Sequence, residues 1–187
     1  MMEQDGKSPH RYLSDQFEVG VGDVIADFGA AEGNVSLDLI ERVDKIYLFE
    51  CDKEWIEALH ATFAPWRDKV EIVAKFVSDK DDRRHCSGDV FFKDRAITFM
   101  KIDVDGGERS LLRGFRTIIR DRLGMKIALC TYHQHEDEAE FTELLEGIGY
   151  KVTPSRGYMI FYYDKKLRAP YLRRALIRAE RGPFSAG

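Results

Sequence analysis

The sequence predicts an α/β fold, with a largely parallel β-sheet and helices on both of its faces. Apolar runs alternate with helical patterns along the 187 residues, as they do in βαβ units. The first run, residues 23–28, leads through a small-residue turn at 29–33 into a helical pattern. The second run, residues 45–49, is followed by the acid Glu50. Together these observations are typical of the opening βαβ unit of a nucleotide-type cofactor site.

The individual elements follow from local composition. Short runs rich in apolar residues predict strands at 23–28, 45–50, 70–77, 97–102 and 126–132. Helical patterns cover residues 33–42, 53–64, 109–123 and 136–148. Pro65 closes the second helix because proline cannot continue it, and Gly149 is a left-handed cap for the last. A hairpin of residues 150–154 and 158–163 completes seven strands, whereas the charged segment 79–95 predicts no clear element.

The predicted organisation is one domain with a shorter segment on each side. Residues 1–22 form an N-terminal arm, 23–163 the cofactor-binding domain and 164–187 a basic C-terminal tail. Basic residues alternate with leucine and isoleucine in the tail, which is typical of a solvated amphipathic helix docked on the domain. The alternative is that the tail attracts an acidic acceptor or touches a membrane surface, as a peripheral contact. The basic residues of the tail are Lys165, Lys166, Arg168, Arg173, Arg174, Arg178 and Arg181.

Composition excludes several classes of protein. Charged residues make up 33% of the chain and the net charge is −4, so no strong positive field points to nucleic acid. The three cysteines, Cys51, Cys86 and Cys130, show no C-x-x-C spacing. That argues against a disulfide framework and against a zinc site, and it suits a reducing cytoplasm. No apolar run reaches the roughly 20 residues of a membrane helix, and the polar start is not a secretory signal.

The spacing of small residues in the first turn distinguishes two cofactors. A dinucleotide site needs G-x-G-x-x-G, but the second and third glycines counted from Gly29 are replaced by Ala31 and Asn34. The pattern of methyltransferases, an acid followed by small residues at every second position, fits Asp27, Gly29, Ala31 and Gly33. In this interpretation Glu50, with Cys51 beside it, accepts both ribose hydroxyls of S-adenosylmethionine. The remaining alternative is a tight turn that binds no ligand.

A second group of acids follows the strand at 97–102. Asp103, Asp105 and Glu108 lie within six residues, next to two glycines. The carboxyl ends of parallel strands meet at one edge of an open sheet, so these acids should lie near Asp27 and Glu50. Crowded carboxylates raise one another's pKa, which favours a shared proton, a hydrogen-bonded hydroxyl or a bound cation.

Over roughly residues 12–163, the chain resembles the FkbM-type S-adenosylmethionine-dependent methyltransferases. The resemblance rests on the segments 24–33, 46–52, 101–108, 111–114 and 128–133. The fourth-strand signature of the family, I-D-V-E-G-A-E, reads here as Ile102-Asp103-Val104-Asp105-Gly106-Gly107-Glu108. Asp105 therefore replaces a glutamate that is one methylene longer, and Gly107 replaces an alanine.

The resemblance implies a Rossmann-like class I methyltransferase fold, with a seven-stranded mostly parallel sheet and a C-terminal antiparallel hairpin. It also implies O-methylation, in which a methyl group moves from S-adenosylmethionine to a hydroxyl of a saccharide, glycan or small natural product. The implied cofactor residues fall into four groups: Asp27, Gly29, Ala31 and Gly33 beside methionine and ribose; Glu50 and Cys51 at the ribose; Phe76, Val77 and Ser78 at the adenine; and Asp103 under the methionine part.

The candidate catalytic residues are His133, Asp103 and Glu108. His133 follows the strand at 126–132, and its ordinary pKa near 6.5 suits a general base. The alternative is that His133 only bonds Asp103 or Glu108 and holds the edge together. No metal is expected; the variant with a divalent Mg²⁺ or Mn²⁺ ion would use Asp103, Asp105 and His133, with Glu108 nearby.

Two other functions stay open. The chain could be a non-catalytic module that binds S-adenosylmethionine, or an NAD-dependent oxidoreductase, although the glycine pattern and the lack of length for a substrate domain oppose the latter. The expected partner is a small-molecule or glycan acceptor rather than nucleic acid, in the cytoplasm and without a transmembrane segment.

Overall fold

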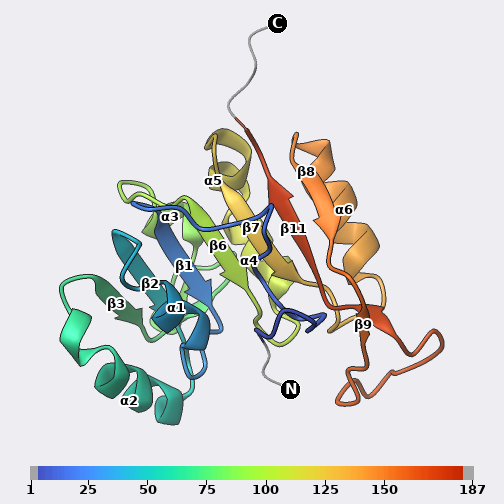
Figure 1. Cartoon of the computed structure of the whole chain (residues 1–187), viewed down its shortest axis with the longest axis horizontal. Coiled ribbons are helices and arrows are strands. Elements are labelled where there is room, and N and C mark those ends of the chain that lie inside the picture. The colour runs from blue at the N-terminus through green and yellow to red at the C-terminus, as the bar shows by residue number, and fades with distance from the viewer. Residues whose placement is uncertain (1–3, 183–187) are drawn as a thin grey trace, which may run out of the picture.

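The computed structural model describes residues 4–182, and a seven-stranded sheet with helices on both faces forms its centre (Figure 1). The strand order is β3-β2-β1-β6-β7-β11-β8. The first five of these strands are parallel, and β11 runs antiparallel to both β7 and β8. The predicted fold class is confirmed. The seven strands are β1 (Val24–Phe28), β2 (Lys45–Phe49), β3 (Val70–Val73), β6 (Phe99–Ile102), β7 (Lys126–Cys130), β8 (Lys151–Pro154) and β11 (Leu176–Glu180).

The remaining elements are short. The helices are α1 (Asn34–Leu39), α2 (Lys53–Thr62), α3 (Gly88–Phe91), α4 (Glu108–Gly114), α5 (Arg116–Asp121) and α6 (Asp137–Gly147), and a 3-10 turn, Ala64–Trp66, follows α2 at Pro65. Two further strand pairs lie outside the main sheet: parallel β4 (Phe76–Val77) with β5 (His85–Cys86), and antiparallel β9 (Tyr158–Met159) with β10 (Arg173–Arg174). Within the described residues, no helix is long and apolar enough to span a membrane.

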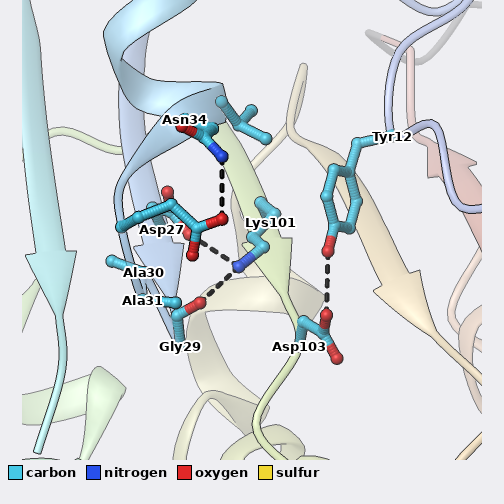
Figure 2. Close-up of a pocket in the computed structure, with 10 residues that line it drawn as sticks. Tyr12, Asp27, Gly29, Ala30, Ala31, Asn34, Lys101 and Asp103 are labelled. Carbon is cyan, nitrogen blue, oxygen red and sulfur yellow. Dashed lines mark hydrogen bonds and ion pairs between the residues drawn. The ribbon is translucent and has the colours of Figure 1, made fainter. Parts of the chain in front are cut away.

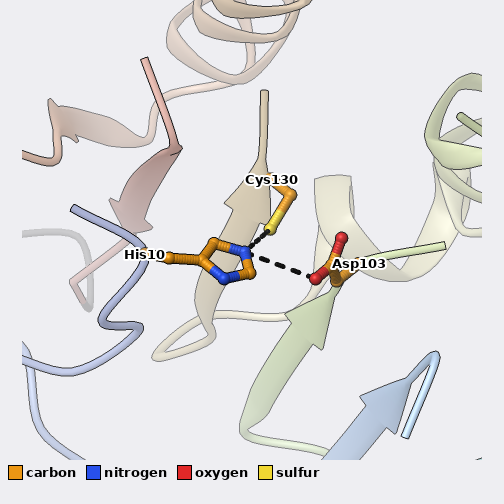
Figure 3. Close-up of side chains that lie close together, drawn as sticks. All are labelled: His10, Asp103 and Cys130. Atoms are coloured by element: carbon orange, nitrogen blue, oxygen red, sulfur yellow. Dashed lines mark hydrogen bonds and ion pairs between the residues drawn. The ribbon is translucent and has the colours of Figure 1, made fainter. Parts of the chain in front are cut away.

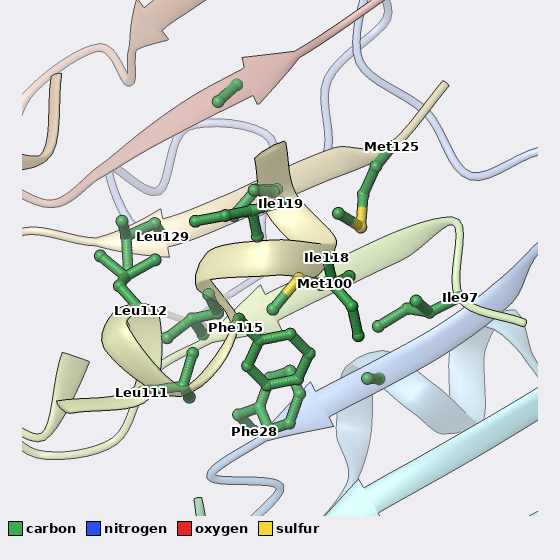
Figure 4. Close-up of a cluster of buried hydrophobic side chains, with 14 of the residues drawn as sticks. Phe28, Ile97, Met100, Leu111, Leu112, Phe115, Ile118, Ile119, Met125 and Leu129 are labelled. Carbon is green, nitrogen blue, oxygen red and sulfur yellow. The ribbon is translucent and has the colours of Figure 1, made fainter. Parts of the chain in front are cut away.

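Side-chain alternation along the central strands creates two cores, one on each face of the sheet. In β1, Ala26 and Phe28 face α4 and α5, where the ring of Phe28 packs 5.2 Å from that of Phe115 (Figure 4). Ile25 packs in the opposite core with residues of α1 and α2. Asp27, which shares the face of Ile25, lies at the end of the strand, so the period of two carries its carboxylate to the carboxyl edge of the sheet.

The N-terminal arm packs against the sheet rather than extending from it. Tyr12, Phe17 and Val19 are buried in the core that contains α1 and α2. Arg178 of β11 donates from its guanidinium to the backbone carbonyl oxygens of Tyr12, at 2.8 Å, and Arg11, at 2.5 Å. The arm therefore lies over the end of the sheet that carries the acids.

The structure corrects the prediction for the C-terminal part. β8 does not pair with the segment at 158–163 but with β11, which comes from the predicted tail and lies between β7 and β8. The antiparallel hairpin is instead β9 with β10. The arginines of the tail suggested a solvated helix, but Ala175, Leu176, Ile177 and Ala179 are fully buried. Residues 183–187 of the tail and 1–3 of the arm lie outside the described residues.

Two other predicted elements are divided. The strand predicted at 70–77 ends at Val73, and Phe76–Val77 turns away to pair with β5. The helix predicted at 109–123 breaks at Phe115 into α4 and α5. At the break, Gly114 meets the backbone of Ser78 so closely that a Cβ atom there would lie 1.9 Å from the Ser78 carbonyl oxygen.

Substitution of two helical glycines by alanine should have opposite effects on stability, because Gly114 makes this close contact and Gly147 makes none. Gly114→Ala should lower the free energy of unfolding by about 1–3 kcal/mol, because a rigid backbone carbonyl occupies the space of the new methyl group. At Gly147, near the end of α6, a new Cβ atom would meet nothing within 4 Å. Gly147→Ala should therefore raise the free energy of unfolding by about 0.5–1 kcal/mol, because alanine has the higher helix propensity. Urea unfolding of both variants measures the difference, and equal effects would contradict the close contact.

Candidate functional site

A cavity of about 150 Å³ opens at the carboxyl ends of β1 and β6 (Figure 2). The strand order reverses between these two strands, because β2 and β3 lie on one side and β7 on the other. Open α/β sheets bind ligands at such a switch point. The cavity is lined by Tyr12, Asp27, Gly29, Ala30, Ala31, Glu32, Asn34, Val35, Lys101 and Asp103.

The turn after β1 has the backbone that its small residues predict. Gly29, Ala31 and Gly33 all have positive φ, of 73°, 45° and 75°. A Cβ atom on Gly29 would lie 1.8 Å from the carbonyl oxygen of Asp103, so only glycine allows the turn to approach the end of β6. Ala31 is one of two described residues other than glycine with positive φ, and its Cβ atom strains that backbone position.

The carboxylate of Asp27 forms an ion pair with Lys101 of β6, a residue that sequence reasoning missed. Asp27 and Lys101 are direct partners in the sheet register, and both are buried. The Lys101 ammonium lies 3.0 Å from Asp27 Oδ1 and donates to the Gly29 carbonyl oxygen at 2.5 Å (Figure 2). Burial lowers the pKa of Lys101, but the charges of Asp27 and Asp103 outweigh it and raise that pKa above its usual range. The sequence did hold a signal for this pair, because Lys101 is a lone charged residue in an apolar strand that neighbours the strand of Asp27.

Glu50 connects the end of β2 to the glycine turn. Its Oε2 atom accepts from the Ala31 backbone N–H at 2.9 Å, and its Oε1 atom accepts from Cys51 and Asp52 at 2.7 and 2.9 Å. Three backbone donors therefore fix this carboxylate where a ribose was predicted. Burial, followed by the charges of Glu50 and Asp52, raises the pKa of the Cys51 thiol, so Cys51 is not an activated nucleophile.

The residues predicted to border the adenine do not line the cavity. Phe76 is exposed and lies 5.7 Å, between ring centroids, from His85. Val77 packs against the core on the α4 side, and Ser78 is buried beneath Gly114. Phe76 and Val77 form β4, which contacts α4, and Ser78 follows that strand.

Asp103 is the most densely contacted acid of the site. Its carboxylate accepts hydrogen bonds from the hydroxyls of Tyr12, at 2.8 Å, and Tyr132, at 3.0 Å. His10 Nε2 lies 3.3 Å from it and His133 Nε2 lies 3.5 Å from it. Burial raises the pKa of Asp103, but the hydrogen bond from His10 and the charge of Lys101 outweigh burial and hold that pKa well below its usual range. Asp103 is therefore ionised.

His133 forms a buried ion pair with Glu108. Its Nδ1 atom lies 2.9 Å from Glu108 Oε1, and Glu108 also accepts from the backbone N–H of Val104. Burial opposes the charged imidazolium, yet interactions with Asp105 and Glu108 raise the pKa of His133 to about 10. These acids therefore favour the protonated ring. This favours the alternative in which His133 holds the edge together over the one in which it is a general base.

Two acids of the β6 loop, Asp103 and Glu108, gather around His133, whereas Asp105 lies at the surface. Asp103, Glu108 and His133 bring one ligand atom each within 4.8 Å of one another. The side chain of Asp105 is 97% exposed, with Oδ1 3.6 Å from His133 Nε2. His10, which no sequence signal identified, comes from the arm and lies beside Asp103 instead.

A larger hollow of about 690 Å³ lies next to this group. It is bounded by the Asp105–Gly106 turn, by His133 and by residues 161–168 of the segment between β9 and β10. Phe161 packs with its ring centroid 5.0 Å from that of His133 and 5.8 Å from that of Tyr163. Lys165 and Lys166 add positive charge to the rim.

Comparison with known proteins shows similarity in structure. No protein-family model matches the sequence, and no curated protein matches it. The fold matches that of an FkbM methyltransferase from Methylobacillus flagellatus KT with a TM-score of 0.72 and 19% identity, over 89% of this chain and 45% of that one. This chain thus spans less than half the length of that protein.

Two further structures extend the comparison. A precorrin-6Y C5,15-methyltransferase from Geobacter metallireducens GS-15 matches with a TM-score of 0.60 and 14% identity, over 88% of this chain and 83% of that one. M. capricolum TrmK, in complex with S-adenosylhomocysteine, matches with a TM-score of 0.52 and 12% identity, over 92% and 72%. The chain therefore has the Rossmann-like fold of class I methyltransferases, and the predicted resemblance to the FkbM type is confirmed at the level of the fold.

Proposed function

We propose that this chain binds S-adenosylmethionine at the switch point and transfers its methyl group to a hydroxyl of a saccharide, glycan or small natural product. The observation that carries the proposal is the cradle formed by the glycine turn. The Gly29 backbone approaches Asp103 so closely that no side chain fits between them, and Glu50 is fixed at the next strand end. A tight small-residue turn after the first strand, with an acid at the end of the second, is the arrangement by which Rossmann-like sites hold a nucleoside.

The residues present fit the cofactor in part by shape and in part by charge. The cavity of about 150 Å³ is smaller than the roughly 300 Å³ of a typical ligand pocket, so it accommodates the methionine part rather than the whole molecule. Glu50 Oε2 accepts one backbone N–H and keeps a second lone pair for a ribose hydroxyl. When bound, the cofactor supplies an electrophilic methyl group on a sulfonium.

Asp103 is the group best placed to receive an acceptor hydroxyl. Its carboxylate lines the cavity and is ionised, so it accepts hydrogen bonds. Its low pKa makes it a weak proton acceptor, and its contribution is therefore mainly alignment. His133 and Glu108, proposed with it as catalytic residues, balance charge behind the carboxylate.

The hollow beside Asp105 and His133 supports a saccharide-like acceptor. Its wall carries Phe161 and Tyr163, and its rim carries lysines and acids. Aromatic faces with a few polar groups around them suit a molecule that has both apolar C–H faces and hydroxyls. The hollow borders His133, so an acceptor held there would be close to Asp103.

A cofactor-binding module without turnover is the second candidate. The observation that favours it is the close contact of His133 with Glu108, which together with the raised pKa of His133 fits a structural ion pair rather than a general base. Calorimetry with S-adenosylmethionine and with NADH tests the cofactor class. Incubation with methyl-labelled cofactor and a pool of glycans then tests turnover; label in the glycans supports the transferase, and binding without label supports the module.

The glycine turn makes two substitutions differ in their effect on S-adenosylhomocysteine binding. Gly29→Ala should abolish binding measured by calorimetry, because its methyl group meets the Asp103 carbonyl. Ala31→Gly should retain binding, because glycine adopts the positive φ of that position without strain. Thermal unfolding of both variants confirms that they fold. Undiminished binding by folded Gly29→Ala would contradict the proposed cradle.

Removal of the Glu50 carboxylate should weaken cofactor binding about 10- to 150-fold, the equivalent of a charged hydrogen bond of about 1.5–3 kcal/mol. The measurement is calorimetry with Glu50→Ala. Glu57→Ala, an exposed acid on α2, is the matched control and should leave the affinity unchanged. Equal affinities of the two variants would refute the assignment of Glu50 to the ribose.

A further inference from the structure

Three side chains with metal-binding atoms meet beside the cofactor cavity (Figure 3). His10 comes from the N-terminal arm, Asp103 follows β6 and Cys130 ends β7. His10 Nε2 lies 3.1 Å from Cys130 Sγ and 3.3 Å from Asp103 Oδ2. One ligand atom from each residue lies within 4.8 Å of the other two. His10 and Cys130 are buried, and the side chain of Asp103 is 15% exposed.

The spacing of these atoms is that of ligands around one ion. Zinc is bound at about 2.0–2.3 Å by nitrogen, oxygen and sulfur, in tetrahedral geometry. Ligand atoms at those lengths lie roughly 3.3–3.6 Å apart. The two short edges of the triangle, 3.1 and 3.3 Å, are close to that range, so an ion needs only small side-chain adjustments.

Three potential partner atoms crowd one nitrogen of His10. Its Nε2 atom is within 3.3 Å of Cys130 Sγ, Asp103 Oδ2 and the Tyr12 hydroxyl. One ring nitrogen offers either one hydrogen or one lone pair, so it forms one good hydrogen bond and not three. A cation among these atoms satisfies the lone pairs of nitrogen, sulfur and carboxylate at once.

The surroundings also resemble those of a bound metal. Ligating carboxylates are themselves hydrogen-bonded, which fixes their orientation. Asp103 accepts from the hydroxyls of both Tyr12 and Tyr132. These donors orient the carboxylate and leave an oxygen lone pair for an ion.

We propose that His10, Asp103 and Cys130 form a Zn²⁺ site that fastens the N-terminal arm over the cofactor cavity. Thiolate and imidazole ligands favour zinc over Mg²⁺ or Mn²⁺, which prefer oxygen. With three protein ligands, the fourth position takes water or a bound group. The site differs from the set of Asp103, Asp105 and His133 predicted from sequence, and it does not depend on the proposed methyl transfer.

The test is metal content after reconstitution. The full chain is stripped with a chelator, incubated with Zn²⁺, passed through a desalting column and analysed for bound metal. The wild-type chain should retain about one zinc ion, and the Co²⁺-loaded chain should show a thiolate-to-Co²⁺ charge-transfer absorption. Cys130→Ser and His10→Gln should each lose the ion, and Tyr12→Phe should weaken zinc binding about 10- to 100-fold.

Cys86→Ser is the matched control, because Cys86 is also buried but belongs to β5, away from the site. It should retain both zinc and the Co²⁺ absorption. His10→Gln alters the arm and not the sheet, so it provides the test if Cys130→Ser does not fold. A wild-type chain that retains no zinc, or a Cys86→Ser chain that loses it, would overturn the site. The assay contains no S-adenosylmethionine, so its result is separate from that of the cofactor experiments.

Discussion

The buried ion pair of Asp27 and Lys101 is the interaction on which the site depends. The two residues face each other across β1 and β6, at the point where the strand order reverses. The Lys101 ammonium lies 3.0 Å from Asp27 Oδ1, 2.5 Å from the Gly29 carbonyl oxygen and 3.4 Å from that of Phe28. An ammonium has three hydrogens, so these partners use all of them. A buried pair contributes little net stability, but loss of one partner costs about 3–5 kcal/mol. The pair therefore fixes the shape of the turn more than it stabilises the domain.

Side chains alternate between the two faces of the sheet, so a second charged residue of the β6 segment lies on the same face as Lys101. Lys101 and Asp103 are two residues apart and lie on one face, where Asp103 meets Tyr12, Tyr132 and the histidines. Behind it, Glu108 balances His133 and accepts from the backbone of the loop between β6 and α4. Each buried charge in this chain of contacts has an opposite partner, so Asp103 is held ionised and in one orientation. A fixed, ionised carboxylate needs no reorganisation when a hydroxyl binds.

The sequence predicted the features that depend on neighbours along the chain. The acid and small residues at 27–33 specify a turn, and apolar runs specify strands, so the central parallel strands and the glycine turn are where they were expected. The errors arise where distant segments meet. The strand β11 was not predicted because arginines are frequent around it and suggested a solvated segment. In the structure, Arg173 donates to the backbone carbonyl of Tyr132, which follows β7, and Arg178 donates to that of Tyr12 in the arm. The contact of His10 with Cys130 joins positions 120 residues apart, and no spacing rule for cysteines detects it.

The pKa values also decide where catalytic power could come from in the proposed reaction. A positioned base contributes about 10²–10⁴-fold when its pKa is near the working pH. Neither His133 nor Asp103 meets that condition, because the pKa of His133 is raised to about 10 and that of Asp103 is lowered. Orientation of two reactants, by contrast, supplies up to about 7–11 kcal/mol. In the proposed reaction, the tyrosine hydroxyls and the arm that hold Asp103 in place would contribute to this orientation. Since the methyl group of a sulfonium is already electrophilic, a site built for alignment rather than for proton abstraction is consistent with methyl transfer to a hydroxyl.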